Sequence, residues 1–531
     1  MTSFDARTQS IFGVAVSNEW PLPVTDGDAL TPAVIEWLTQ PGPRDPSGIS
    51  RYLSELWRER ADLRETFPGI AFDRVQRDEF LAWADAFALQ ETGADPKLIP
   101  SSTNRASATS FGSAIGLDTE GEVASFDVTV VGYLRAQLGL GAAGRRLVRL
   151  CEAAGIRVQS IPYDQTASPL TVSWPDAPLE SLTPTDITVL CVNAEELPRL
   201  ARALGPTLLG STYRIGLWFW ELDTLPDRVE LTAAFNLVDE IWVTTEFVAG
   251  AFRKRAIELG VSTPVNVIQL GVDLTDSESA ATSADLNNLF SREEETAPSS
   301  RLVDRVTLGF PVGFVIGCVF DYASTLERKN PLGVVQAFRQ AFPLPFELGP
   351  DLGPWLVFKT SGSSEFDNDR ERIRQAIDNR RDIITIDRNF SASDQHGLYR
   401  KLDAFISLHR SEGYGLGPLE AMANGVPTIA TAYSGNLSFM NESNSWLVPW
   451  TPGSVPEGCG QYPPRAMWAE PDVGVAAQYL RHVVLDHQSA TVRSRAERGR
   501  SDVSELVAGS LAGAWLLRRI SEIREVRKLP D

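Results

Sequence analysis

The chain has 531 residues, which corresponds to about three domains if an ordinary domain has roughly 150 residues. Its 43% hydrophobic and 22% charged residues are typical of a soluble globular protein and exclude a fibrous or largely disordered chain. The net charge of −20 argues against general nucleic-acid binding, because neutralising phosphates requires a basic surface. We therefore expect no nucleic-acid partner and only local groups of basic residues that bind anions.

Cysteine usage and the first residues bear on the cellular compartment. Cys151, Cys191, Cys318 and Cys459 are far apart, form no Cys-x-x-Cys pair, and are accompanied by only four histidines. This spacing argues against a zinc site or a disulfide framework. The amino terminus has no basic segment followed by an apolar run, and no stretch approaches 18 consecutive apolar residues. The sequence therefore predicts a cytoplasmic chain that does not span a membrane.

The first 125 residues differ in pattern from the rest. Between Pro32 and Leu98, aromatic residues and leucines recur three and four positions apart, as in ISRYLSELWRERADL, which is typical of amphipathic helices. Residues 1–125 hold 19 acidic and 10 basic residues, about half of the chain's excess negative charge. The small, polar stretch from Ser101 to Gly121 indicates a linker. We predict a helical accessory domain followed by this linker.

From Ser125 on, short β-branched runs alternate with helical stretches. FDVTVVGY, IRVQSIPYD, ITVLCVN, YRIGLWFW, EIWVTT and VNVIQLGVD predict strands over residues 126–274. GFVIGCVF, WLVFKT, IITID, AFISL and PTIAT predict strands over residues 306–470. The acidic segment 275–305 separates the two series, and residues 471–531 are predicted to form a helical tail. We expect an α/β protein with two Rossmann-like domains and a ligand cleft at the carboxyl ends of their parallel strands.

The most informative segment is SEGYGLGPLEAMANGVPTIAT, from Ser411 to Thr431. A strand ends, a glycine-rich loop follows, and Pro418 is expected to open a helix. The N–H groups and positive dipole end of that helix would attract an anion. Glu412 and Glu420 bracket the loop, where a carboxylate can accept hydrogen bonds from sugar or ribose hydroxyls. The residues alone equally allow Glu420 to be a favourable first-turn acid and Glu412 a solvated loop residue.

The Glu-x7-Glu spacing, with EGYGLGPLEAMA and then GVPTIAT, resembles the signature of retaining GT-B glycosyltransferases of group 1, family 4-like type, which use nucleotide-sugar donors. The resemblance implies a GT-B fold with residues 126–274 on the acceptor side and residues 306–470 on the donor side of the cleft. It also implies that Glu412 faces the donor sugar and that Glu420 binds the nucleotide ribose. The residues between them complete the implied donor site: Gly413, Gly415, Leu416 and Gly417.

A second segment, VFDYASTLERKNPLGVVQAFRQAF, places Arg328 and Lys329 just before a predicted helix. Two cations there would neutralise a diphosphate leaving group, and a solvated basic pair at a helix start is the other explanation. The family commonly has a Gly-Arg pair at the end of the preceding strand, where Phe320 and Asp321 stand here. We expect Arg328 to replace the missing arginine, so that the catalytic residues are Arg328, Lys329 and Glu412.

Glycine-rich loops in both predicted domains add candidates for donor binding. YSGNLSFM resembles a family loop in which Gly435 and Asn436 would offer N–H groups to the donor, although a plain turn explains them almost as well. GLGAAGRRL resembles the family's loop after the first strand, with Gly139 and Gly141 near the donor. Together with Gly144 these glycines also spell Gly-x-Gly-x-x-Gly, so dinucleotide binding is an alternative for this one loop.

Other candidates concern sugar contacts and metal binding. Trp220 and Glu221 stand where many family members have a histidine that contacts the transferred sugar; they are candidates for acceptor or sugar contact, and a helix-start acid explains Glu221 equally well. Residues 26–28 and 367–369 spell Asp-x-Asp, which we interpret as solvated turns in polar loops. His409 is predicted to be a packing or loop residue. GT-B enzymes generally use basic residues and a helix end, so we expect no metal and no cofactor.

Basic residues gather at two further places. Arg145, Arg146 and Arg149 share one predicted helix, and residues 253–255 form another cluster. Such patches could attract anionic lipid headgroups, whereas a solvated helix face is the simpler explanation.

These observations predict a cytoplasmic, retaining hexosyltransferase that uses a nucleotide diphosphate sugar and a glycan or lipid-linked acceptor. Polysaccharide or glycolipid biosynthesis, and peripheral association with the inner face of the cell membrane, are further expectations. The competing hypothesis is a non-catalytic GT-B partner that binds and stabilises another glycosyltransferase or its acceptor. The pattern predicts no particular oligomeric state.

Overall fold

The computed structural model describes residues 38–39, 49–70, 74–84, 98, 126–166, 168, 170–176, 185–201, 204, 212–273, 309–349, 352–362, 366–388 and 397–527. The chain divides into two compact units. The first comprises the described parts of Met1–Phe126, Leu182–Thr188 and Glu196–Tyr213, and the second those of Asp127–Ser181, Val189–Glu195 and Arg214–Asp531. The predicted linkers at 101–121 and 275–305 lie outside the described residues.

The first unit includes helices α3 (Arg51–Glu59), α4 (Ala61–Thr66) and α5 (Arg74–Trp83). The hydroxyl of Ser50 caps α3 by accepting a hydrogen bond from the N–H of Leu53. Helical structure is therefore confirmed here, but the stretch predicted from ISRYLSELWRERADL is interrupted at Arg60, whose extended backbone separates α3 from α4. Leu53 and Phe80 belong to one cluster of buried apolar residues, so this unit has a core of its own.

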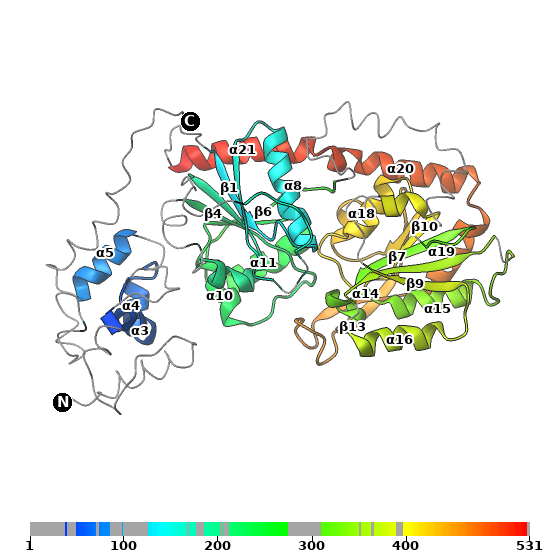
Figure 1. Ribbon diagram of the computed structural model, residues 1–531, viewed down its shortest axis with the longest axis horizontal. Helices are drawn as coiled ribbons and strands as arrows, with labels where there is room; N and C mark the ends of the chain where they lie inside the picture. Colours follow the sequence, from blue (N-terminus) through cyan, green and yellow to red (C-terminus); the bar gives the residue numbers. More distant parts are fainter. Residues whose placement is uncertain are drawn as a thin grey trace. The chain divides into compact units, whose positions relative to one another are not determined.

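One six-stranded sheet, with the helices packed on it, forms what we call the amino-terminal half of the second unit. The strand order is β2-β1-β3-β4-β5-β6. The strands are β1 (Val128–Gly132), β2 (Val158–Pro162), β3 (Ile187–Cys191), β4 (Tyr213–Leu217), β5 (Glu240–Val243) and β6 (Val265–Val267). Helix α8 (Gly139–Ala153) packs on β1 and β2, and α11 (Glu246–Leu259) packs on β5 and β6, while α10 (Val229–Phe235) follows β4 (Figure 1). All six strands predicted for this half are confirmed.

A second parallel sheet, of order β12-β11-β10-β7-β8-β9, forms the carboxy-terminal half. Its strands are β7 (Val315–Asp321), β8 (Trp355–Ser361), β9 (Ile383–Asp387), β10 (Ala404–Ser407), β11 (Thr428–Thr431) and β12 (Trp446–Val448). Its helices include α14 (Leu326–Lys329), α15 (Pro331–Ala341), α16 (Asp367–Ile377), α18 (Leu416–Ala423) and α19 (Val473–Leu485). Strands β7 and β10 are neighbours although they are far apart in the chain, so the segments that follow them meet at one edge of the sheet.

An antiparallel hairpin follows β12 and was not predicted. It consists of β13 (Trp450–Ser454) and β14 (Met467–Pro471). Pro452 and Gly453 interrupt the apolar pattern of β13, and most of that strand is exposed, so neither alternation nor a buried run marks it. The loop between the two strands, residues 455–466, carries one residue of the candidate site.

The predicted helical tail is confirmed as α19, α20 (Ala490–Ala508) and α21 (Ser510–Arg527). The last two helices meet at Gly509, whose φ of 73° is left-handed and favours glycine. Helix α21 packs against the amino-terminal half, where Arg519 meets Glu240 and Arg524 lies 3.0 Å from Asp127 (Figure 1). The carboxy-terminal segment therefore contacts both halves of the second unit.

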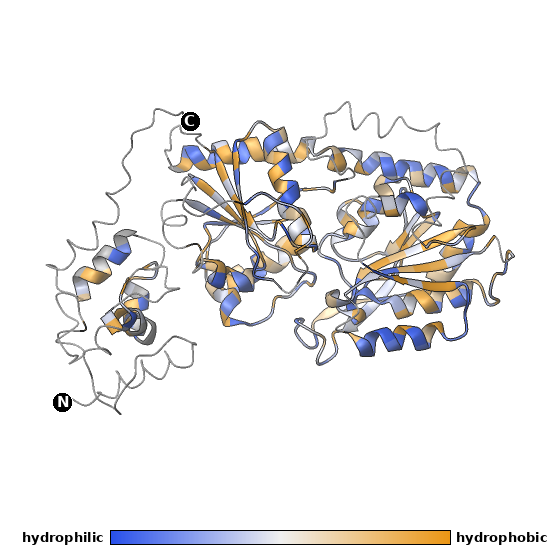
Figure 2. Cartoon of the chain, viewed as in Figure 1, coloured by the Kyte–Doolittle hydropathy of each residue, from blue (hydrophilic) through white to orange (hydrophobic). Residues whose placement is uncertain are grey.

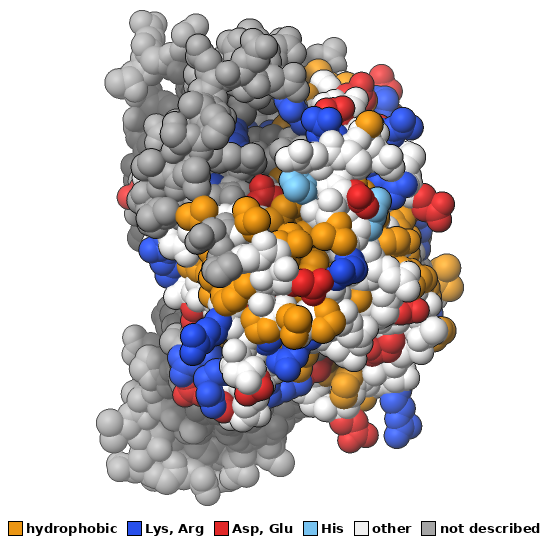
Figure 3. Space-filling model, turned by 90° about the vertical axis from the view of Figure 1, so that its right-hand side faces the viewer, with side chains coloured by type: hydrophobic (Ala, Val, Ile, Leu, Met, Phe, Trp, Pro, Cys, Tyr) orange, Lys and Arg blue, Asp and Glu red, His pale blue; other side chains and the backbone are white. Residues whose placement is uncertain are grey.

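Hydropathy follows this layered arrangement. In Figure 2 the strands of both sheets are hydrophobic, whereas α16 is strongly hydrophilic. Figure 3 shows a face on which hydrophobic side chains gather between charged ones; the exposed apolar residues of the carboxy-terminal half include Leu344 and Leu352.

All four cysteines are buried and unpaired. Among the described helices, none has the length and apolar character needed to cross a membrane.

Candidate active site

A cleft of about 1200 Å³ lies between the two halves of the second unit. Its walls come from α8 and from the ends of β4 and β5 on one side, and from α14 and the start of α18 on the other. Most residues that the sequence singled out line it: Gly139, Trp220, Glu221, Arg328, Lys329, Glu412, Gly413, Gly415, Leu416, Gly417 and Glu420. Gly141, Gly435 and Asn436 are not among its lining residues.

In the wall formed by the carboxy-terminal half, Glu412 meets Arg328 and Lys329. Lys329 Nζ donates a hydrogen bond to Glu412 Oε1 over 2.5 Å, and a terminal nitrogen of Arg328 lies 3.3 Å from Oε2. The order of the sheet explains this meeting, because the two cations follow β7 and the glutamate follows the adjacent β10. The cluster therefore contains two cations and a single carboxylate.

Burial distinguishes between the interpretations that the sequence left open for this cluster. Glu412 is 8% exposed and Arg328 is 3% exposed, so neither is a solvated residue. Burial by itself would raise the pKa of Glu412, but the charges of Lys329 and then Arg328 outweigh it and lower this pKa to about 2. Glu412 is therefore ionised at neutral pH and cannot serve as a proton donor.

The guanidinium of Arg328 is held from several sides. One terminal nitrogen donates to the carbonyl oxygen of Ser411 over 2.9 Å, and the guanidinium carbon lies 5.9 Å from the ring centre of Tyr462. Its Nε finds no hydrogen-bond partner in the part of the chain that the structure describes. A buried nitrogen without a partner leaves one donor available for a ligand.

Helix α18 begins at Leu416, two residues earlier than predicted, so Pro418 does not open it. Its N-cap is Gly415, with a left-handed φ of 92°, and no side chain caps the first N–H groups. Glu420 lies beyond the first turn, so the explanation of Glu420 as a first-turn acid is wrong. Burial and then the proximity of Glu420 raise the pKa of Tyr399, which places this carboxylate beside a buried hydroxyl.

Two glycines of the candidate site are required by close approach of the backbone. A Cβ on Gly413 would come within 2.4 Å of the carbonyl oxygen of Trp220, and one on Gly435 within 2.0 Å of the carbonyl oxygen of Gly413. Asn436 is fully buried and donates from Nδ2 to the carbonyl oxygen of Thr431 over 3.0 Å. The Asn436 side chain thus holds its own loop in place.

The glycine-rich segment of the amino-terminal half starts α8. A Cβ on Gly139 would lie 3.7 Å from Leu416, so the starts of α8 and α18 face each other, whereas Gly141 packs against carbonyl oxygens of the preceding loop. The dinucleotide alternative requires an acid after the second strand, where the nearest is Asp164. That residue is ion-paired with Arg135 at 3.0 Å.

Tyr462, in the loop of the unpredicted hairpin, is a site residue that no motif indicated. Its hydroxyl donates to Glu221 Oε2 over 3.1 Å, and its ring centre lies 5.6 Å from that of Trp220. The next helix, α10, begins only at Val229, so Glu221 is not a helix-start acid. Nothing in the stretch GCGQYPPR marks Tyr462, because only the hairpin brings it into contact with Glu221 and Trp220.

Four of the arginines in the two basic clusters are engaged in ion pairs: Arg146, Arg149, Arg253 and Arg255. Arg146 lies 2.6 Å from Asp273, which also accepts from Arg149, and Arg146 donates to a carbonyl oxygen at the end of α20. Arg253 pairs with Glu246 at 2.7 Å. Arg146 and Arg149 thus form neither an open basic patch nor a solvated face, and both interpretations of that cluster are wrong for these two residues.

The structure also corrects one Asp-x-Asp interpretation. Asp367 and Asp369 occupy the first turn of α16 and pair with arginines of the same helix, so they lie in a helix and not in a loop. Residues 26–28 lie outside the described residues. In the described ranges there is no group of three or more His, Cys, Asp or Glu side chains that could hold a metal ion.

His409 is fully buried and its Nδ1 lies 3.1 Å from Ser407 Oγ, which confirms a packing role.

Residues 322–450, which contain Arg328, Lys329, Glu412 and Glu420, match the family model of the glycosyl transferases group 1. This segment is a group 1 glycosyltransferase domain. The chain is also 64% identical, over 33 residues, to the lipopolysaccharide core biosynthesis mannosyltransferase LpsB of Rhizobium meliloti. That stretch covers 6% of this chain and 9% of LpsB.

A solved structure with a TM-score of 0.50 shares the fold of this chain. A glycosyltransferase from Rickettsia africae is 15% identical, with a TM-score of 0.50 over 75% of this chain and 98% of that chain. The Anabaena protein HepE, solved in complex with UDP and glucose, is 16% identical, with a TM-score of 0.49 over 75% of this chain and 100% of that chain. Two Rossmann-like halves that face a cleft make this architecture GT-B.

Proposed function

We propose that the chain is a retaining glycosyltransferase that moves a hexose from a nucleotide diphosphate sugar to a hydroxyl group of a glycan or lipid-linked acceptor. The group 1 domain supports the reaction class, and the short match to a mannosyltransferase supports a hexose. The observation that carries the proposal is the buried cluster of Glu412, Arg328 and Lys329 beside the uncapped start of α18. The proposal places the reaction in polysaccharide or glycolipid biosynthesis, in the cytoplasm, and at the inner face of the membrane when the acceptor is a lipid.

The cluster suits a leaving diphosphate because it carries an excess of positive charge in a buried place. Arg328 and Lys329 share one carboxylate, and the first N–H groups of α18 add the positive end of a helix dipole. Negative charge that develops on the departing diphosphate would be stabilised by groups already held in position. This stabilisation requires no metal and no cofactor.

Glu412 and Glu420 would then orient the donor. The ionised carboxylate of Glu412 can accept hydrogen bonds from sugar hydroxyls, and Glu420 from the hydroxyls of the ribose. The acceptor hydroxyl would attack the anomeric carbon on the face from which the diphosphate departs. Its oxygen forms the new C–O bond while the C–O bond to the diphosphate breaks, its proton passes to the departing diphosphate, and no covalent enzyme intermediate forms. Catalysis in this proposal rests on positioning and electrostatic stabilisation.

A donor panel tests the proposal. The protein is incubated with UDP-, GDP-, ADP- and dTDP-linked hexoses, with and without a lipid-linked acceptor, and the released nucleoside diphosphate is measured by chromatography. We expect release with one donor class, an unchanged anomeric configuration in the product by NMR, and full activity after treatment with EDTA. Absence of release with every donor would contradict the proposal and favour the competing hypothesis of a non-catalytic GT-B partner.

A further inference from the structure

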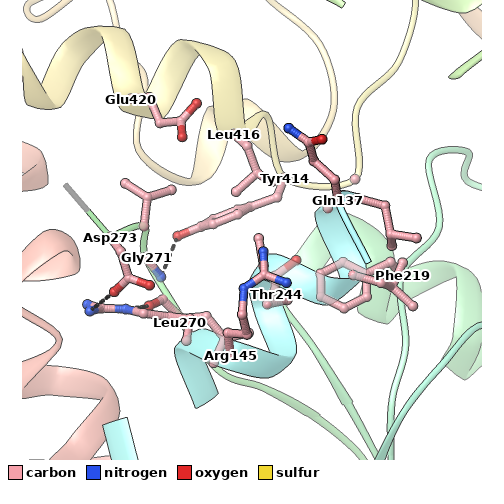
Figure 4. A pocket seen from close by; sticks show the side chains of 18 of the residues that line it. Gln137, Arg145, Phe219, Thr244, Leu270, Gly271, Asp273, Tyr414, Leu416 and Glu420 are labelled. Atoms are coloured by element: carbon pink, nitrogen blue, oxygen red, sulfur yellow. Dashed lines mark hydrogen bonds and ion pairs between the residues drawn. The ribbon is translucent and has the colours of Figure 1, made fainter. Parts of the chain in front are cut away.

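The wall formed by the amino-terminal half carries a second polar region, distinct from the cluster around Glu412. Arg145 projects into the cleft from α8, Thr244 lies directly after β5, and Phe219 follows β4. Figure 4 shows these side chains on the side of the cleft opposite the start of α18. The ends of two adjacent parallel strands and one helix therefore converge on this region.

Arg145 is a cation that backbone carbonyl groups hold in place. Its NH1 group donates to the carbonyl oxygens of Leu134 and Ala136, both at 3.1 Å, and within the described ranges it forms no salt bridge with a carboxylate. The nearby Asp273 is already shared by two other arginines of α8. Burial and then the charge of Arg149 lower the pKa of Arg145 to about 10, so it remains charged at neutral pH in a place where an anion would relieve the cost of its burial.

Thr244 supplies an independent observation. The residue is only 2% exposed, yet its hydroxyl has no hydrogen-bond partner among the residues that the structure describes. A buried hydroxyl is normally paired, and one that lines a cleft is available to a ligand. The neighbouring Thr245 shows the usual outcome, because its hydroxyl donates to the carbonyl oxygen of Gly413 over 2.8 Å.

We propose that Arg145 and Thr244 bind an anionic oxygen group, a phosphate or a carboxylate, that belongs to the acceptor. This inference rests on the proposed function, which assigns the diphosphate of the donor to Arg328 and Lys329 in the opposite wall and leaves the amino-terminal wall to the acceptor. Phe219 adds a partly exposed ring against which a sugar can pack. The acceptor is therefore a glycan or lipid-linked sugar that carries a negative charge near the hydroxyl that is glycosylated.

Binding of small probes tests this inference on the full chain. The protein is first saturated with the nucleoside diphosphate that the donor panel identifies, so that Arg328 and Lys329 are occupied. Glucose 6-phosphate, glucuronate and glucose are then titrated by calorimetry. We expect one or both charged probes to bind at least tenfold more tightly than glucose, and the stronger of the two identifies phosphate or carboxylate as the preferred group.

Variants then assign the binding to residues. Arg145→Gln should weaken the charged probe at least tenfold and Thr244→Val at least threefold, whereas Arg145→Lys should retain most of the affinity. Lys254→Gln, which removes an exposed charge of the same half, should change nothing. Thr244→Val keeps the shape of the side chain and removes a hydroxyl that forms no hydrogen bond with the described residues. This variant therefore still tests the inference if Arg145→Gln fails to fold.

Three results would overturn the inference: equal binding of charged and neutral probes, unchanged binding in Arg145→Gln and Thr244→Val, or a loss of nucleoside diphosphate affinity instead of probe affinity in Arg145→Gln. Failure of the proposed function has a different signature, because then no nucleoside diphosphate binds at all. The probe titrations, repeated without nucleotide, still compare the variants with the wild type in that case.

Discussion

Replacing Glu412 by glutamine tests the buried cluster directly. The substitution keeps the shape of the side chain but removes the charge that Lys329 meets at 2.5 Å and Arg328 at 3.3 Å. The side chains of Glu412 and Arg328 are only 10% and 4% exposed, so solvent screens the loss weakly. Removing one member of a buried ion pair costs about 3–5 kcal/mol. We expect a fall of about 3 kcal/mol in the free energy of unfolding, the lower end, because the amide oxygen can still accept from Lys329.

The same substitution should also slow the transfer reaction. We expect kcat to fall roughly a hundredfold or more, as when one preorganised polar group is removed from a charged transition state. Urea unfolding and release of nucleoside diphosphate measure the two effects, and Glu442→Gln, an exposed residue of the same half, is the control. Adding Lys329→Met should restore part of the stability but not the activity. A Glu412→Gln protein as stable as the wild type would refute the pairing argument, and an unchanged kcat would refute the role of Glu412 in transfer.

Three further predictions concern pH, the hairpin loop and the tail. The folded chain lowers the pKa of Glu412 from 4.5 to about 2, so the ionised carboxylate stabilises the fold above pH 4.5 and this stabilisation is lost as pH falls toward 2. Between these pH values, urea unfolding should show a steeper loss of unfolding free energy for the wild type than for Glu412→Gln. Tyr462→Phe removes the donor to Glu221 and should cost about 1–2 kcal/mol in chemical unfolding, so an unchanged midpoint would contradict the contact. Arg519→Ala leaves the fully buried Glu240 without its cation and should cost about 3–5 kcal/mol; a melting temperature equal to that of wild type would count against this account.

The strands of both sheets were largely predictable from the sequence, and the reason is physical. Parallel strands covered on both faces form nearly continuous apolar, β-branched runs, as ITVLCVN and GFVIGCVF do. The three strands that the sequence did not predict lie after residue 445. Of these, β12 has three residues, β13 is mostly exposed, and both hairpin strands lie outside the main sheet. Short or exposed strands lack the pattern on which the prediction depends.

Helix starts were harder to predict because capping signals are absent. Helix α18 begins two residues before the predicted position, and neither Leu138 nor Gly415, the N-caps of α8 and α18, forms a side-chain capping hydrogen bond. The usual Ser, Thr, Asp or Asn signal does not occur there. The break at Arg60 is likewise unmarked, because arginine is a good helix former and only the fold turns the chain at that point.

The sequence predicted which residues belong to the candidate site, but it did not predict which of them are in contact. Glu412, Arg328 and Lys329 could be named from their motifs, yet their direct contact depends on β7 and β10 being neighbours, which pattern alone does not specify. The position of Tyr462 depends on the hairpin of β13 and β14, which the sequence did not predict. Arg146 is a basic residue whose partner Asp273 lies 127 positions away, so its ion pair could not be read from local sequence.

The position of α21 constrains how this protein could be recombined with its relatives. The helix is encoded after the carboxy-terminal half, but Arg519 and Arg524 attach it to Glu240 and Asp127 of the amino-terminal half. A chimera that takes its carboxy-terminal half from a related protein at a single junction would replace this helix with one that lacks these partners. Such an exchange needs a second junction, at Gly509, so that the final 22 residues stay with the amino-terminal half they complete.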